Sequence, residues 1–423
     1  MRGARLELHQ VAPRVLTSPA APPPAPPTPV DWRRNLAALW FAEFTAIFGF
    51  SFAFPFLPVY LRELGVHDPG QLAIWSGVAG GASGAALAVM SPIWGVLADR
   101  YGRRAMLLRA MVGAGLTVGL MGFARGPLDL VVLRLVQGST SGTVSAATAL
   151  VATGTPRHRV GWALGVLSSA IAVGSALGPL VGGLLAGALG ARAIFWAAGV
   201  LLAAATLPVL LVVREAPVTR SEHDQRSAVQ LLRAAAPGAV AAVGALIVGQ
   251  ALLQSSYSGA QSVVVLRLLE HLSAGVEAVT GVAFAAAGLA SALASVLYIG
   301  IARRLGFRVV GVLAAVLMAG SQLLMGWSSG VGAIVAGAAL AGLFYGCIGP
   351  VISTMIGMET PTAAQARVFG VGASATALGF GLGPLSGGVV ASRLGTSIAL
   401  SICATIAVLL AVVLAGRARE PAR

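Results

Sequence analysis

The sequence is dominated by twelve long apolar runs joined by short polar connections. They lie at about 36–61, 73–97, 105–124, 128–151, 160–188, 193–213, 236–266, 275–300, 307–326, 329–357, 365–391 and 395–416. Each is long enough to cross the ~30 Å hydrocarbon core of a bilayer as a helix of ~20 residues. Backbone groups inside lipid must be hydrogen-bonded within the protein, so such runs fold as helices. We therefore expect an all-α integral membrane protein with twelve transmembrane helices in contact with the lipid bilayer.

The composition excludes several classes of function. Charged residues make up 10% of the chain and mean hydropathy is +0.87, whereas soluble domains have roughly 25% charged residues. The net charge of +14 comes from arginines in short loops, so no basic face for nucleic acid is predicted. Cys347 and Cys403 stand alone in apolar runs, and every histidine falls in a tail or loop, so we expect no metal site or cofactor. The chain has no lysine, which excludes a G-x4-G-K-[ST] phosphate loop and makes ATP-driven transport by this chain alone improbable.

One charged gap, at 214–235, separates six apolar runs from the next six. The predicted organisation is a disordered, Pro-rich cytoplasmic tail at 1–35, a six-helix bundle at 36–213, a cytoplasmic linker at 214–235, a second six-helix bundle at 236–416 and a short cytoplasmic tail at 417–423. Of the 28 arginines, 22 fall on the side of the tails and the central gap. By the positive-inside rule both termini are expected in the cytoplasm. The use of arginine without lysine is typical of a GC-rich bacterial genome, so we expect a bacterial cytoplasmic (inner) membrane.

An internal repeat relates the two halves. Thr155-Pro156 stands as far before Gly178-Pro179 as Thr360-Pro361 stands before Gly383-Pro384. The equivalent small residues of the second half are Gly379, Gly383, Pro384, Gly387 and Gly388. Two parallel repeats of six helices place a substrate cavity between the halves, and they predict transport by alternating access.

The loop between the second and third runs carries one acid among several arginines. Its chemistry-bearing residues are Gly95, Asp99, Arg100, Gly102, Arg103 and Arg104. This loop resembles the signature G-x-L-A-D-R-x-G-R-R/K of the major facilitator superfamily. The resemblance implies that Asp99 and its arginines latch the cytoplasmic face, with the acid capping a helix of the other half. A basic loop that only fixes topology is the alternative. In the second half, Arg303 stands where Asp99 would fall, so a second latch is expected to be degenerate or absent.

The fourth run carries a second motif of that superfamily, R-x-x-Q-G, as Arg134, Gln137 and Gly138. A charge at a helix centre costs ~2.5–3.5 kcal/mol even on insertion scales. Arg134 is therefore expected to face the bundle interior, where the resemblance implies a role in proton coupling. Snorkelling to the outer headgroups is the alternative.

The fifth run resembles the motif that marks antiporters of the superfamily, with Gly174, Gly178, Pro179, Gly182 and Gly183. Glycines four residues apart form a smooth groove for close helix packing, which is a complete structural explanation, so antiport is implied by resemblance alone. The first half also contains a G-x5-P-x-x-P pattern ending at Pro58. In these features it is similar to the twelve-helix drug:proton antiporters, in particular to MdtG-like bacterial multidrug exporters; the second half matches only loosely.

Glu43 is the only carboxylate clearly inside an apolar run. Burial in lipid or protein favours its neutral form, so it is the leading candidate to load and release protons. The alternative is a charged residue near the cytoplasmic end of a helix that begins later than predicted.

A polar stripe follows the seventh run at helical spacing, formed by Gln250, Gln254, Tyr257 and Gln261. It could line the substrate cavity or bind neighbouring helices. The function expected from all these features is proton-coupled export of small amphipathic molecules by a protein that is not an enzyme, is monomeric and has protons and a small-molecule substrate as partners. The alternatives are a carrier for one defined metabolite, sugar or siderophore and, far behind, a membrane-embedded enzyme or sensor.

Overall fold

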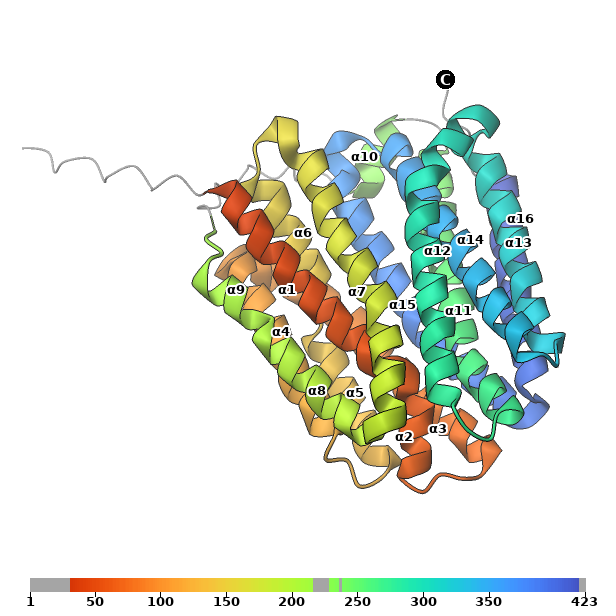
Figure 1. The fold of residues 1–423 in the computed structure, drawn as a ribbon. Coiled ribbons are helices and arrows are strands. Elements are labelled where there is room, and N and C mark those ends of the chain that lie inside the picture. Colours follow the sequence, from red (N-terminus) through yellow and green to blue (C-terminus); the bar gives the residue numbers. More distant parts are fainter. Residues whose placement is uncertain (1–30, 216–227, 236–237, 418–423) are drawn as a thin grey trace, which may run out of the picture.

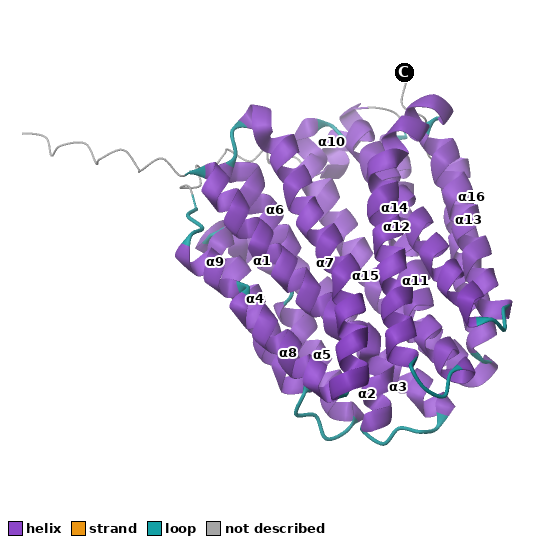
Figure 2. Cartoon of the chain, in the orientation of Figure 1, coloured by secondary structure: helices purple, strands orange, loops and turns teal. Residues whose placement is uncertain are grey.

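The computed structural model describes residues 31–215, 228–235 and 238–417, and all regular structure in these segments is helical (Figures 1 and 2). Eleven of the described helical stretches are long and apolar enough to cross a membrane. The elements of the first half are α1 (Trp32–Ala53), η1 (Phe54–Phe56), α2 (Leu57–Glu63), α3 (Pro69–Tyr101), α4 (Arg103–Met121), α5 (Pro127–Thr140), α6 (Thr143–Gly154), η2 (Arg157–Arg159), α7 (Val160–Leu189), α8 (Ala191–Ala204) and α9 (Thr206–Leu211). Those that follow are α10 (Ala228–Ala235), α11 (Ala239–His271), α12 (Val276–Leu305), α13 (Phe307–Trp327), α14 (Val331–Glu359), α15 (Thr362–Leu394) and α16 (Thr396–Arg417).

The predicted fourth span is broken, which explains why only eleven stretches are long enough. It consists of α5 and α6, with 14 and 12 residues. Gly142, between them, has a φ of +126°. This conformation interrupts a right-handed helix, and residues other than glycine rarely adopt it. The first span is also interrupted, at η1, where Pro55 lacks the amide hydrogen that a continuous helix requires.

Two bundles of six predicted spans make up the molecule. In the first, which we call the N-half, α1 packs on α7, α3 on α5 and α4 on α8. In the second, the C-half, α11 packs on α15, α12 on α14 and α13 on α16. The halves meet mainly along α3 with α15 and α7 with α12. The predicted all-α membrane fold with two pseudo-symmetric halves is confirmed.

The glycine motif of α7 joins two partners at once. A side chain on Gly178 would meet Ser51 and Phe48 of α1, and one on Gly183 would meet the backbone of α12 at Gly281. The equivalent motif of α15 packs through its glycines on α11 of its own half and through Gly388 on α3 of the other. Small residues thus let backbones touch both inside each half and between the halves.

The halves touch toward the end remote from the start of α1 and the end of α16, here called the far end; the opposite end is called the terminal end (Figure 1). On α3, positions 77 and 84 press against α15. Gly95 lies on the same helical face but nearer the terminal end. No described atom of another helix comes within 4 Å of a Cβ placed on Gly95. On α15, Gly381 and Gly388 contact α3, whereas no described atom of another helix comes within 4 Å of a Cβ placed on Gly370. Among the described residues, the two halves are therefore in contact toward the far end and apart at the terminal end.

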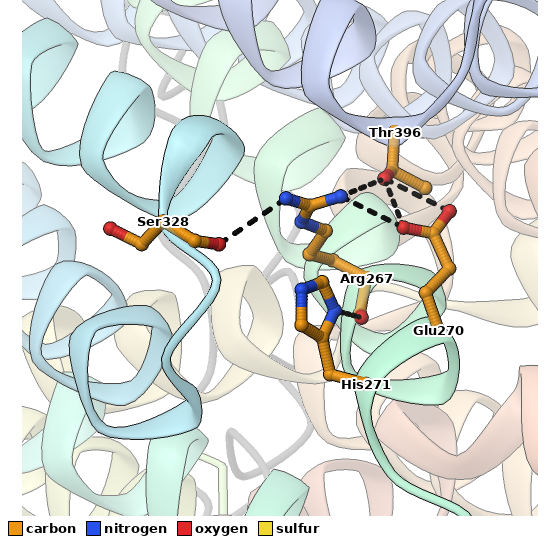
Figure 3. A network of polar contacts seen from close by, with 5 residues as sticks. All are labelled: Arg267, Glu270, His271, Ser328 and Thr396. Atoms are coloured by element: carbon orange, nitrogen blue, oxygen red, sulfur yellow. Dashed lines mark hydrogen bonds and ion pairs between the residues drawn. The ribbon is translucent and has the colours of Figure 1, made fainter.

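An equivalent clamp fixes the far end of each half. In the N-half, Tyr60 donates to the carbonyl of Met121 at 2.8 Å, and the Glu63 carboxylate accepts from the amide of Ala191, the first residue of α8, at 2.7 Å. In the C-half, Arg267 donates to the carbonyl of Ser328, and the Glu270 carboxylate accepts from Thr396 Oγ1, at the start of α16 (Figure 3). The contacts thus hold α2, α4 and α8 together in the N-half and the equivalent helices α11, α13 and α16 together in the C-half.

One helix begins earlier than predicted, and the predicted linker contains a short helix. α1 begins at Trp32, inside the segment predicted as tail, because the Asp31 carboxylate accepts from the amides of Arg33 and Arg34 and caps the helix. The predicted linker contains α10; its residues 216–227, like 1–30 and 418–423 of the predicted tails, lie outside the described residues.

Candidate functional site

Glu43 lies in the middle of α1 with a fully buried side chain. Neither carboxyl oxygen has a hydrogen-bond partner among the described residues. Thr143, the first residue of α6, lies beside the carboxyl group. The carboxyl therefore faces the N-terminal end of a half-helix, where free amide groups and the helix dipole favour negative charge. A buried carboxyl with no fixed partner can change its protonation state without breaking an ion pair.

A second buried polar group lies on the other side of the helix break. Arg134 of α5 is 5% exposed, its Nε donates to the carbonyl of Ala79 at 3.1 Å, and its Nη1 donates to Gln137 Oε1 at 3.1 Å. The guanidinium also lies over the ring of Phe54, 4.2 Å from the centroid. Phe54 belongs to η1, which contacts α11 and α12 of the C-half. The arginine is thus buried within the protein, next to a segment that contacts both halves.

Polar side chains of the broken helix lie between Glu43 and Arg134. Gln137 accepts from Arg134 and donates to Ser141 Oγ at 3.0 Å, and Ser141 is followed by the break at Gly142. Thr143, next to the Glu43 carboxyl, starts the following half-helix. Arg134, Gln137 and Ser141 thus form a polar path that ends at the break in the predicted fourth span, and Glu43 lies across the break beside Thr143. Gly138 of the same motif packs directly on the backbone of α3 at Ser83.

Arg109 of α4 joins this region, a place that the sequence analysis did not assign to it. Its guanidinium lies over the ring of Trp94, 3.5 Å from the centroid, and its Nη2 donates to the carbonyl of Ser141 at 3.3 Å. It therefore binds the carbonyl of the residue that caps the C-terminal end of α5, where a cation is favourable. Its position inside the third apolar run was the feature of the sequence that could have indicated this place.

The predicted stripe of α11 lies in the C-half, where Tyr345 of α14 completes it. Tyr257 and Tyr345 stack with ring centroids 4.0 Å apart, and Tyr345 donates to Gln254 Oε1 at 2.9 Å. The Oε1 atom of Gln250 is buried without a partner among the described residues. Gln261, nearer the far end, is half-buried. Two stacked phenols beside amide groups form a surface that can stack on a flat ligand and accept or donate hydrogen bonds.

The loop between α3 and α4 binds its own half. Arg104 donates to the carbonyl of Leu210, near the end of α9, at 2.8 Å, and Arg103 lies within 3.4 Å of the carbonyl of Ala149. The Glu215 carboxylate accepts from the amides of Arg103 and Arg104 at 2.8 and 3.0 Å and caps α4. The side chain of Asp99 lies outside the described residues, and Arg100 is exposed. Sequence reasoning placed Glu215 in the linker, because its partners are brought to it only by folding.

The part of the chain that the structure describes contains no group of three His, Cys, Asp or Glu side chains arranged to hold a metal ion. The site is built instead from one buried acid, two arginines and a broken helix in the N-half, together with a tyrosine–glutamine cluster in the C-half.

The family model of the Major Facilitator Superfamily matches residues 39–274 and 246–423. The chain belongs to the Major Facilitator Superfamily. It is therefore a multi-pass membrane protein of a transporter family and not an enzyme. The superfamily that its motifs resemble is confirmed.

Curated relatives are similar to this chain over about half of its length. The multidrug resistance protein MdtG of Rahnella sp. (strain Y9602) is 42% identical over 205 residues, covering 48% of this chain and 50% of the relative. MdtG of Escherichia coli O1:K1 / APEC is 41% identical over 197 residues, covering 46% and 48%. The matched region thus spans about half the length of these relatives.

Solved structures of the superfamily share the fold along nearly the whole chain. A variant of the nucleoside transporter NupG has a TM-score of 0.73 at 14% identity, covering 92% of this chain and 100% of that one. A POT family transporter in complex with 5-aminolevulinic acid has a TM-score of 0.73 at 15% identity, covering 91% and 96%. At these identities the likeness concerns the fold alone.

Proposed function

We propose that this transporter exports small amphipathic molecules, among them cationic drugs, in exchange for protons. The observation that carries the proposal is Glu43, buried in α1 with no partner among the described residues and placed at the start of the half-helix α6. The similarity to multidrug resistance proteins at about 41–42% identity supports the cargo class. Cytoplasmic termini, the predicted orientation, would make the separated terminal end face the cytoplasm.

The proposed cycle uses Glu43 as the proton carrier. With the halves apart at the terminal end, a neutral Glu43 loses its proton to the cytoplasm when a cationic cargo enters, because the carboxylate is stabilised by the cargo charge. Closure at the terminal end and opening at the far end then expose the same carboxyl to the other side, where it takes up a proton and the cargo leaves. Arg134 acts at the far side of the same polar path, so its contacts transmit the charge state of Glu43 through the fourth span.

The test compares Glu43→Gln with Glu359→Gln, which changes an acid at the end of α14 and serves as a matched control. The first measurement is proton release on adding a cationic substrate to purified protein. The second is export by everted vesicles with an imposed proton gradient. Glu43→Gln is expected to lose both, while Glu359→Gln retains them. Wild-type behaviour of Glu43→Gln in both assays would contradict the proposal.

A carrier for one defined metabolite is a second candidate, favoured by the tyrosine–glutamine cluster of the C-half. Gln254, Tyr257 and Tyr345 form a directional hydrogen-bonding and stacking surface, and a site with fixed polar partners rejects analogues that lack the matching group. A panel of chemically unrelated cargoes decides between the two. Export of several classes supports multidrug efflux, whereas export of one class with sharp rejection of its analogues supports the dedicated carrier.

A further inference from the structure

A pocket of about 520 Å³ lies between the first turns of α1 and α7, at the terminal end and apart from the site described above. Figure 1 shows these two helices side by side. The lining is aromatic and aliphatic, with Trp32, Trp40 and Phe41 from α1 and Trp162 from α7. Arg33 and Arg159 contribute the charged groups.

The pocket opens toward the outside of the N-half. α7 meets α12 through Pro179 and Gly183, but its pocket residues Trp162 and Val166 lie on a different face. That face continues along α7 as Val173, Leu177 and Leu184, all exposed. In a protein that spans a membrane, an exposed stripe of large apolar residues faces lipid tails. The pocket is thus the terminal-end extension of a lipid-facing surface.

Aromatic contacts hold the walls of the pocket in place. Trp40 of α1 donates from Nε1 to Ser169 Oγ of α7 at 3.0 Å and stacks on Phe44. Trp32 and Trp162 meet edge to face with centroids 6.4 Å apart. Indole rings at the end of a membrane span are typical of the headgroup region.

The charges at the rim are positive. The Arg33 guanidinium lies over the ring of Trp32, 5.4 Å from its centroid, and Arg159 stands at the start of α7. The neighbouring acid, Asp31, is engaged by the backbone amides that it caps. An apolar pocket at headgroup depth with two arginines at its mouth matches a molecule with an anionic head and a hydrocarbon tail.

We propose that this pocket binds an anionic phospholipid of the adjoining leaflet, with its phosphate between Arg33 and Arg159 and an acyl chain against Trp40 and Phe41. A bound lipid here spans α1, which carries Glu43, and α7, which carries the glycine motif. It therefore ties two helices of the transport site at their terminal ends.

The experiment measures quenching of tryptophan fluorescence by brominated lipids in purified, full-length protein. Three of the seven tryptophans line the pocket. Brominated phosphatidylglycerol is expected to quench at lower mole fraction than brominated phosphatidylcholine. The double variant Arg33→Gln with Arg159→Gln is expected to lose this preference by roughly five-fold per arginine. Arg34→Gln is the matched control, because Arg34 is exposed on the same turn and does not line the pocket.

A second variant tests the cavity itself. Ala37→Leu fills the pocket and keeps both arginines, so it is expected to lower quenching by either lipid. Circular dichroism and size-exclusion profiles establish that each variant is folded.

Three results would overturn the proposal. One is equal quenching by both lipids in the wild type. Another is equal loss of preference in Arg34→Gln and the double variant, which would indicate diffuse surface charge. The third is quenching that appears only after removal of residues 1–30, which would mean that the N-terminal segment fills the pocket.

Discussion

Single buried charges define the N-half, and each is held differently. Glu43 has no hydrogen-bond partner among the described residues, whereas Arg134 is held by one carbonyl, one amide oxygen and one ring face. The unpartnered acid can change its protonation state without breaking an ion pair. In the proposed cycle the arginine, held by these three contacts, supplies a fixed positive charge while the acid gains and loses its proton.

Replacing Arg134 by lysine tests the importance of its geometry. An ammonium group is a compact charge, so it cannot reach the Ala79 carbonyl and Gln137 while also covering the Phe54 ring. Losing one hydrogen bond to a charged group costs about 1.5–3 kcal/mol, so we expect transport in proteoliposomes to fall at least ten-fold. Arg125→Lys, at the far-end turn between α4 and α5, is the control. Equal rates in both variants would show that positive charge alone is enough at position 134.

Sequence reasoning located these charges but not their partners. A carboxylate or an arginine inside an apolar run is visible in a single sequence, because lipid makes such residues expensive. The carbonyl of Ala79 that binds Arg134 and the Trp94 ring under Arg109 both come from another helix, α3. Only the packing of α3 on α5 and α4 creates these contacts. For the same reason the sequence did not reveal the contacts of Tyr345 and Glu215.

Among the helices, the broken ones carry the site. The interruption of the first span is readable from Pro55 and Pro58, whereas the interruption of the fourth has no proline. Its only signal is Gly142 within a run of serine and threonine, 139–143, whose side chains compete for backbone hydrogen bonds. A continuous apolar run therefore predicted one span where the chain forms two half-helices.

Gly142→Ala is expected to weaken the break. A side chain at φ of +126° is strained by about 1–3 kcal/mol. We expect a lower midpoint of thermal unfolding and reduced transport, because relief of the strain straightens the fourth span and moves Thr143 away from Glu43. Gly154→Ala, at the end of α6 with nothing within 4 Å, is the control. An unchanged midpoint and rate in Gly142→Ala would mean that the break is not required.

The whole molecule follows the internal repeat that its sequence displays. The equivalence of the two glycine motifs predicted equivalent fifth and eleventh spans, and α7 and α15 occupy equivalent places. What the repeat could not predict is which end is closed, because both states of a rocking carrier are built from the same sequence.

The orientation of the molecule is tested by cysteine labelling in intact cells. Cysteines introduced at Arg220 and Arg423 are expected to react only with membrane-permeant thiol reagents. A cysteine at His67, which is exposed in the far-end turn between α2 and α3, is expected to react with impermeant reagents too. The background is a variant with Cys347 and Cys403 replaced. Impermeant labelling at all three positions would contradict cytoplasmic termini.

In the proposed cycle, the glycine contacts between α3 and α15 serve as the fulcrum about which the two halves rotate. From position 84 to the end of α3 near position 100 the arm is ~24 Å long, at ~1.5 Å per residue. A rotation of ~15° about the fulcrum displaces the end of that arm by ~6 Å, while atoms at the fulcrum itself hardly move. Because the two backbones are in direct contact there, few side-chain atoms lie between the helices at the fulcrum. A gate wide enough for a drug-sized molecule can therefore open and shut without the two halves ever losing contact.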